Sequence, residues 1–215
     1  VRRIAQRLDD VRLACPVHAV VRDGDGLRVD HAHGSDRFDQ VVMACHSDQA
    51  LTLLGPTASP AQRQVLSAIR YQPNRAVLHT DRALLPRDEK LWSAWNYFAA
   101  RAAGDDRPVG VSYLINKLQP LPFKTPVVVT LNPAREPDPA RVIAEFDYAH
   151  PIYDAPAIAA QRNLPAVQGE GGVWLAGAWG CYGFHEDGLK SALEVANRLG
   201  VLAPWQGQPV VAARQ

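Results

Sequence analysis

The sequence has 215 residues, with 23 Lys and Arg against 22 Asp and Glu, so its formal net charge is +1. This near balance provides no strongly basic surface for a nucleic acid or an anionic membrane. Apolar residues make up 47% of the chain and charged residues 21%, which is typical of a globular protein with its own core. We therefore expect a folded protein without a nucleic-acid partner.

The three cysteines, Cys15, Cys45 and Cys181, are an odd number and lie far apart, which does not favour a disulfide framework. The sequence shows no signal-peptide pattern and no apolar run near the ~18 residues of a membrane span. These features predict a cytoplasmic protein with reduced thiols. Because the sequence begins at Val1 and its one methionine is Met43, we expect the carboxy-terminal part of a longer protein.

Residues 1–10 predict a short helical lead-in, and a β-hairpin follows. The β-type segments 17–21 and 27–29 flank the turn Asp23-Gly24-Asp25-Gly26. Asp-Gly between two apolar segments is a strong hairpin signal, because glycine adopts positive φ at little cost.

A second turn is expected at 34–36, before the apolar run Phe38–Ala44. Such a run is typical of a strand buried on both faces. Ser47–Leu54 then predicts a short helix, with Ser47 as its N-cap.

The middle of the chain predicts one helix and then an antiparallel, mostly meandering sheet over about residues 70–148. Ser59-Pro60 has the pattern of a helix start before apolar residues at helical spacing. Strands are expected at 76–78, 91–96, 109–115, 127–131 and 142–148. Nine of the 17 prolines lie between Pro120 and Pro165, which predicts tight connections and no long helix there.

The last part of the chain predicts a buried strand, a glycine loop and a helix. The strand Val173–Ala176 ends at Gly177, and an amphipathic helix starts near Glu186 or Asp187 and ends at Gly200. A helix start offers free N–H groups and the positive end of the helix dipole, which suits an electron-rich ligand. On spacing alone, a tightly packed join without a ligand explains the loop equally well.

These patterns predict a split architecture that combines α/β and α+β organisation. Residues 1–57 and 166–203 are expected to form one domain, and residues 58–165 an inserted antiparallel-sheet domain. Residues 204–215 are expected to be a tail.

Three segments carry a resemblance to a known family. Residues 15–22 with the hairpin resemble the start of the three-stranded meander in the FAD domain of flavin-containing amine oxidases and phytoene-desaturase-like proteins. Residues 38–51 resemble the closing strand and following turn of that domain, and residues 177–188 resemble its carboxy-terminal flavin motif. The phrase at 184–189 is similar to one in a bacterial branch of predicted NAD/FAD-binding, amine oxidase-like proteins. The resemblance implies an incomplete, Rossmann-like FAD-binding domain that carries an inserted substrate domain.

The resemblance also implies which residues contact FAD. Val17 matches a backbone contact to the adenine side, Gly177 and Ala178 match the strand end near the pyrophosphate and ribityl chain, and residues 186–188 match the helix start facing the flavin ring. Ala178 departs from the family, where the position after the glycine is usually acidic, and this puts amine oxidation in doubt. The candidate cofactor-binding residues are Val17, Gly177, Ala178, Trp179, Gly183, Phe184, His185, Glu186, Asp187 and Gly188.

The chain lacks the Gly-x-Gly-x-x-Gly turn with which such proteins bind the pyrophosphate. The pair Gly24 and Gly26 is followed by Val29 at the third position and belongs to the hairpin. We therefore expect that the longer parent binds FAD and that this chain alone does not retain it.

Other candidate residues have two interpretations each. His185 is the candidate for proton transfer or a hydrogen bond to the flavin, although a helix-cap histidine explains it too. Trp179 is a candidate ligand contact. Trp95 and Tyr113 are candidates for the wall of a substrate cavity, although tryptophans are more often core residues.

No metal is expected, because His31 and His33 are more typical of a solvated strand end than of a ligand pair. The resemblance implies an FAD-dependent oxidoreductase that transfers a hydride from an amine or lipid-like small molecule to flavin N5. Two alternatives are a non-catalytic binding module and a flavin-dependent isomerase without net redox chemistry.

Overall fold

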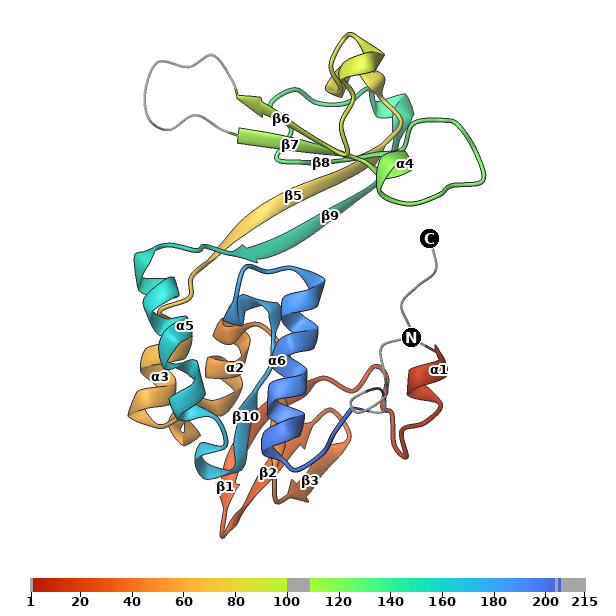
Figure 1. Ribbon diagram of the computed structural model, residues 1–215. Coiled ribbons are helices and arrows are strands. Elements are labelled where there is room, and N and C mark those ends of the chain that lie inside the picture. The colour runs from red at the N-terminus through yellow and green to blue at the C-terminus, as the bar shows by residue number, and fades with distance from the viewer. Residues whose placement is uncertain (1, 100–108, 204, 206–215) are drawn as a thin grey trace. The chain divides into compact units, whose positions relative to one another are not determined.

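The computed structural model describes residues 2–99, 109–203 and 205, and the chain divides into two compact units (Figure 1). Unit 1 comprises residues 1–70 and 151–215, and unit 2 comprises residues 71–150. Unit 2 is therefore shorter at both ends than the insert expected at 58–165. The difference arises because the helices on either side of unit 2 pack against each other within unit 1.

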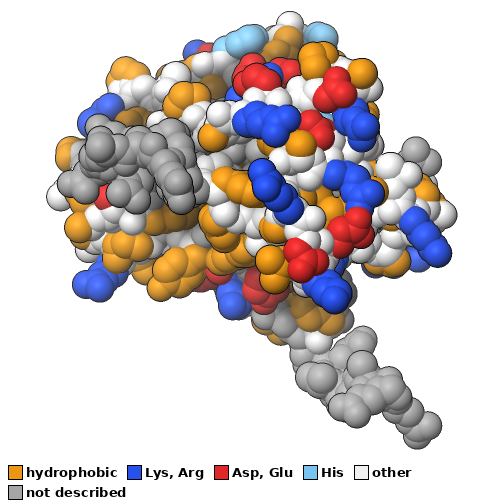
Figure 2. Space-filling view, turned by 90° about the horizontal axis from the view of Figure 1, so that it is seen from above, with side chains coloured by type: hydrophobic (Ala, Val, Ile, Leu, Met, Phe, Trp, Pro, Cys, Tyr) orange, Lys and Arg blue, Asp and Glu red, His pale blue; other side chains and the backbone are white. Residues whose placement is uncertain are grey.

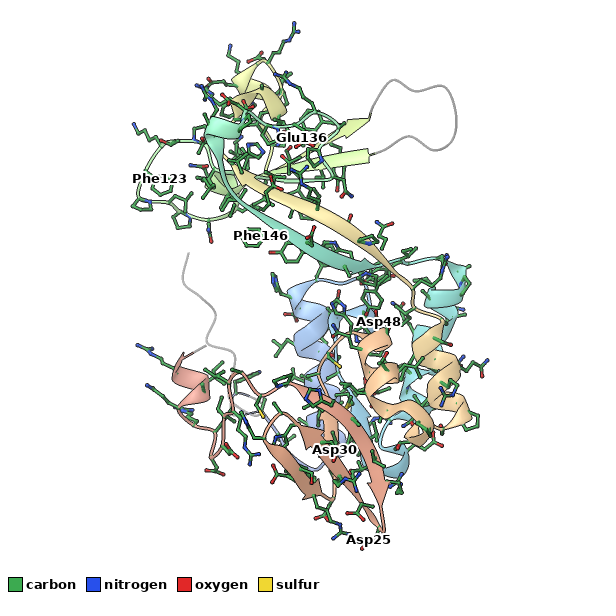
Figure 3. The ribbon with its side chains drawn as sticks, turned by 180° about the vertical axis from the view of Figure 1, so that it is seen from behind. Asp25, Asp30, Asp48, Phe123, Glu136 and Phe146 are labelled. Carbon is green, nitrogen blue, oxygen red and sulfur yellow. The ribbon has the colours of Figure 1, made fainter. Side chains whose placement is uncertain are left out.

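A three-stranded antiparallel sheet follows the lead-in of unit 1, in the order β1-β2-β3. Its strands are β1 (Val17–Asp23), β2 (Gly26–His31) and β3 (Gly34–Phe38). The predicted first hairpin is present, and Asp25 lies at its tip (Figure 3). The turn expected at 34–36 is wrong, because His31 pairs with Gly34 and the chain reverses at residues 32–33 instead.

The second sheet of unit 1 is a parallel pair, β4 (Val41–Met43) beside β10 (Val173–Leu175). The expectation that the first of these strands is buried on both faces is not met. Met43 is buried but Val42 is 45% exposed, because successive side chains point to opposite faces and the face with Val42 is open among the described residues.

Helices flank strand β10 in unit 1 (Figure 1). The helices of unit 1 are α1 (Arg2–Ala5), α2 (Ser47–Leu54), α3 (Pro60–Ser67), α5 (Ala155–Val167) and α6 (His185–Arg198). The predicted start of α3 is confirmed, because the Gln62 N–H donates to Ser59 Oγ at 3.1 Å and the Ser59 N–H donates to Gln62 Oε1 at 3.1 Å. This reciprocal pair satisfies two N–H groups that the first helical turn leaves without partners.

Helix α5 overturns the expectation that the prolines exclude a long helix from this stretch. It has 13 residues and includes Pro156 in its first turn and Pro165 in its last. A first-turn proline removes an N–H that has no helical acceptor anyway, and a last-turn proline disturbs few bonds. Asp154 caps the helix by accepting from the Ala157 N–H at 3.0 Å, and Arg70 donates to the same carboxylate at 2.7 Å.

Unit 2 is a five-stranded sheet in the order β6-β7-β8-β5-β9. Its elements are β5 (Tyr71–His79), β6 (Trp95–Ala99), β7 (Val109–Leu114), α4 (Ile115–Leu118), β8 (Val128–Leu131) and β9 (Val142–Pro151). Strands β6, β7 and β8 form the predicted antiparallel meander, and β5 lies between β8 and β9. The strand expected at 91–96 begins only at Trp95, because residues 89–91 form a 3₁₀ turn.

Short 3₁₀ turns complete both units. They lie at Gly55–Thr57, Arg82–Leu84, Glu89–Leu91, Pro139–Arg141, Glu170–Gly172 and Ala178–Gly180. None of the described helices is long and apolar enough to cross a bilayer. On the face drawn in Figure 2, basic and acidic side chains are interspersed.

Candidate functional site

The loop between β10 and α6 holds most of the predicted site residues. The strand is tied to β4 at its end, where the Ala176 N–H donates to Met43 O at 3.1 Å. The next amide, of Gly177, donates to Ser191 Oγ at 2.9 Å, and that hydroxyl donates to Gly188 O at 2.9 Å. One serine of α6 therefore fixes both the strand exit and the first turn of the helix.

Trp179 is part of the interior of unit 1. Its side chain is buried, and its indole N–H donates to Cys45 O at 3.0 Å. A Cβ on Gly177 would lie 2.3 Å from Trp179 Nε1, so the glycine is needed for this packing. The structure thus places the indole among core residues, where the sequence favoured a ligand contact.

Gly183 packs against Tyr153, which lies two residues before α5. Its φ is +87°, and a Cβ there would lie 2.5 Å from the tyrosine hydroxyl oxygen. Left-handed backbone and close packing both select glycine at this position.

Asp187 organises the loop from within. Its Oδ2 atom accepts from the Tyr182 N–H at 3.2 Å and from the Phe184 N–H at 3.0 Å, and the residue is buried. It also lines a pocket of about 240 Å³ between α5 and α6, together with Gln161 and Cys181. The carboxylate therefore serves to fix the helix start.

The first amides of α6 are the available donors of the loop. Within the described residues, the N–H groups of His185 and Glu186 have no acceptor, whereas those of Asp187 and Gly188 donate to Phe184 O. Residues 182–186 are all exposed. The helix is 14 residues long, so its start carries the positive end of a substantial dipole. The sequence placed this start at Glu186 or Asp187, one or two residues too late.

This donor set fits an electron-rich group such as the pyrimidine edge of a flavin. Two adjacent, exposed amides at a helix start can donate to one carbonyl or phosphate oxygen. Gly188 lies beside Ala178, and a Cβ on Gly188 would be 3.8 Å from the Ala178 Cβ, which is an ordinary van der Waals contact. The available donors of this loop are therefore backbone groups, and position 178 carries no acidic side chain.

Val17, the predicted adenine contact, lies on a different element of unit 1. It begins β1 and lines a surface pocket of about 360 Å³ with residues of α2, among them Asp48 and Thr52. Its partly exposed position leaves it open to a ligand.

The two candidate substrate-cavity residues belong to unit 2. Trp95 and Tyr113 pair across β6 and β7, with ring centroids 6.0 Å apart and planes at 77°. Trp95 is 45% exposed, so it is not the core residue that its type suggests. Trp92 packs against the core instead and donates to Pro86 O at 2.8 Å.

Unit 2 also contains a buried polar chain that sequence reasoning missed. The Asp81 N–H donates to His79 Nδ1 at 3.0 Å, so the proton of this imidazole is on Nε2, which donates to Thr130 Oγ1 at 2.8 Å. The Ser112 hydroxyl is 2.7 Å from the Thr130 hydroxyl. Burial lowers the pKa of His79, which keeps the ring neutral. The members come from three strands, so no local sequence pattern identifies them.

Metal ligands were not expected in this chain. Within the part of the chain that the structure describes, no group of three or more His, Cys, Asp or Glu side chains is placed to hold a metal ion.

Comparisons with known proteins add a family and a fold. The family model for flavin containing amine oxidoreductase matches residues 1–113. A CLA-producing fatty acid isomerase from P. acnes has a TM-score of 0.61 and 12% identity, covering 93% of this chain and 51% of that one. A reduced UDP-galactopyranose mutase has a TM-score of 0.54 and 11% identity, covering 86% and 46%. Such low identities establish the fold alone.

The chain spans about half the length of these solved structures. No curated protein matches it.

Proposed function

The chain belongs to the flavin containing amine oxidoreductase family, and on this premise we propose that it forms the carboxy-terminal part of an FAD-dependent oxidoreductase. The observation that carries the proposal is the pair of exposed amides, of His185 and Glu186, at the start of α6. They are the donors that the electron-rich edge of a flavin ring requires.

The residues of the loop act by holding and orienting. The two amides and the helix dipole stabilise negative charge on a group placed at the start of α6. Asp187 keeps the loop in the shape that exposes them, through its bonds to the Tyr182 and Phe184 amides. A bound flavin would supply the two-electron chemistry, accepting a hydride from a C–H bond of the substrate.

The proposal includes the fragment hypothesis. The Gly-x-Gly-x-x-Gly turn is absent from the sequence, and the chain spans about half the length of the solved structures it matches. We therefore assign pyrophosphate binding to a segment outside this sequence.

The substrate is proposed to be an amine or a lipid-like small molecule, with Trp95 and Tyr113 on the cavity wall. These two aromatic side chains contact each other in unit 2 and are partly exposed, which supports an apolar substrate. A flavin-dependent isomerase is the alternative, because a fatty acid isomerase and a mutase share this fold.

The test separates the amide of His185 from its side chain. His185 is the first residue of α6, where proline is tolerated, so His185→Pro removes the N–H and keeps the helix. His185→Ala removes the imidazole and keeps the N–H. FAD is titrated into the ¹⁵N-labelled chain, and shifts of the backbone amide signals report binding.

We expect FAD to shift the amide signals of Glu186 and its neighbours. His185→Pro should weaken binding ~5-fold, the value of one hydrogen bond of about 1 kcal/mol, and His185→Ala by less than about twofold. Equal affinity in the proline variant and the unmodified chain would refute the amide site. If only His185→Ala weakened FAD binding, the contact to FAD would be assigned to the His185 imidazole instead of the amide.

A further inference from the structure

Three polar side chains of unit 1 form a relay beside the three-stranded sheet. Cys15 Sγ lies 3.3 Å from His31 Nδ1, and His31 Nε2 lies 3.0 Å from Asp36 Oδ2. The imidazole is nearly enclosed, with its side chain 8% exposed. Cys15 follows Ala14, whose φ of +52° lies in the left-handed region, which is unusual for a residue with a Cβ.

The backbone fixes which nitrogen of His31 faces the thiol as an acceptor. The His33 N–H donates to Nδ1 at 3.2 Å, so Nδ1 carries the lone pair. The proton is therefore on Nε2, which donates to Asp36 at 3.0 Å, and Arg12 Nη1 lies 3.3 Å from the same nitrogen. In this tautomer Nδ1 is the base that faces the Cys15 thiol, and Asp36 orients the ring through its contact with Nε2.

Arg12 holds Asp36 in its ionised form. Its guanidinium donates to Asp36 and, through Nε at 2.8 Å, to Asp10. The hydrogen bond from Arg12, followed by the one from His31, lowers the pKa of Asp36. The third member of the relay is therefore charged at neutral pH.

A surface pocket of about 500 Å³ opens on the thiol. Its apolar wall consists of Val17, Val29 and Phe38. Its charged groups are two carboxylates and two guanidiniums, Asp10, Asp36, Arg12 and Arg37. Because these charges balance, the pocket favours a small uncharged ligand.

From this arrangement we infer that Cys15 is a nucleophilic thiol and a site of covalent modification by small uncharged carbon electrophiles. The Cys15 proton passes to His31 Nδ1, and the sulfur electron pair forms a bond to the electrophilic carbon. With an alkyl iodide, the carbon–iodine bond breaks and iodide leaves with its electron pair, and the imidazolium then releases the proton to water. The inference does not depend on flavin binding.

The chain supplies its own reference thiol in Cys45. Burial, followed by the nearby Asp48, raises the pKa of Cys45, so this thiol reacts slowly. An ordinary thiol with a pKa of ~8.5 is only about 3% thiolate at pH 7, so a fully assisted thiol gains at most ~30-fold. We expect iodoacetamide to alkylate Cys15 ~10-fold faster than Cys45 in the native 215-residue chain.

The experiment follows each cysteine by peptide mass spectrometry after timed quenching. His31→Gln should slow Cys15 alkylation ~10-fold at pH 7 and leave Cys45 unchanged. His18→Gln, at an exposed position of β1, is the matched control and should change neither rate. An ordinary thiol with a pKa of ~8.5 needs no base at pH ~10, so the Cys15 rates of the unmodified chain and of His31→Gln should converge there.

A rate difference that persists at pH ~10 would mean that His31 only shapes the pocket, and it would overturn the inference. So would equal Cys15 rates at pH 7, or Cys45 reacting as fast as Cys15. If circular dichroism shows that His31→Gln has unfolded, the Cys15 alkylation rate is measured in Asp36→Asn instead. It keeps the side-chain size and should slow Cys15 several-fold at pH 7.

Discussion

Gly183 and Gly200 differ in why glycine is required: both have left-handed backbone, but only at Gly183 would a Cβ also clash with a neighbour. Both have left-handed backbone, with φ of +87° and +77°. A Cβ on Gly183 would meet the Tyr153 hydroxyl at 2.5 Å, whereas a Cβ on Gly200 would have nothing within 4 Å. We expect Gly200→Ala to cost about 1 kcal/mol of unfolding free energy from backbone strain, and Gly183→Ala ~1–3 kcal/mol more from the added clash.

Urea unfolding of the two variants measures this difference. Tyr153→Phe removes the hydroxyl oxygen that the new Cβ of Gly183→Ala would meet. In the Tyr153→Phe background, Gly183→Ala should therefore lower the unfolding free energy by about as much as Gly200→Ala does in the unmodified chain. Equal costs for the two alanine variants in the unmodified background would contradict a packing role for Gly183.

At the scale of elements, the buried chain through His79 links strands β5, β8 and β7 of unit 2 and makes their stability depend on pH. His79 is fully buried and its pKa is lowered by burial, so the folded state resists the proton that the unfolded state accepts at about pH 6.5. Above that pH the stability is fully present. As the pH falls below about 6.5 the unfolded state gains the proton first, and unit 2 loses up to ~1.4 kcal/mol per pH unit until the folded-state pKa is reached.

Hydrogen exchange of the β7 and β8 amides between pH 7.5 and pH 5.5 tests this locally, after correction for the intrinsic exchange rate. Protection should fall across this range in the unmodified chain and stay level in His79→Gln. The same fall in His79→Gln would assign the pH dependence to another group.

Local signals predicted the elements that depend on local chemistry. The first hairpin follows from Asp-Gly, the start of α3 from Ser59-Pro60, and the order strand, glycine loop and helix from residues 173–200. Errors arose where distant contacts decide. Helix α5 tolerates its prolines because they lie in its first and last turns, and the distant Arg70 donates to the Asp154 carboxylate that caps it.

The two candidate sites also differ in whether local sequence or distant contacts determine them. A glycine loop before an amphipathic helix is visible in the sequence, so the exposed amides of α6 could be anticipated. The Cys15, His31 and Asp36 relay could not, because its members meet only when the segment before β1 folds against β2 and β3. Similarly, the burial of Trp179 depends on Cys45, which is distant in sequence.

For the molecule as a whole, the strength of the α6 site limits what the chain binds alone. Two amides to an electron-rich group contribute about 2 kcal/mol, and the helix dipole adds no more than about 1 kcal/mol at an exposed site. Retention through gel filtration needs a dissociation constant of about 1 μM or lower, which corresponds to about 8 kcal/mol. The donors described in unit 1 fall well short of that affinity.

We therefore expect the 215-residue chain, incubated with excess FAD and passed through gel filtration, to elute without the visible absorbance of a flavin. The reason is the missing pyrophosphate turn, since the diphosphate carries the charge that such a turn binds through several amides at once. His185→Pro should elute in the same way and with the same volume, which would show that the variant is as compact as the unmodified chain. Stoichiometric flavin absorbance in the protein peak would show that the chain holds a pyrophosphate site of its own, and the assignment of that function to a missing segment would have to be withdrawn.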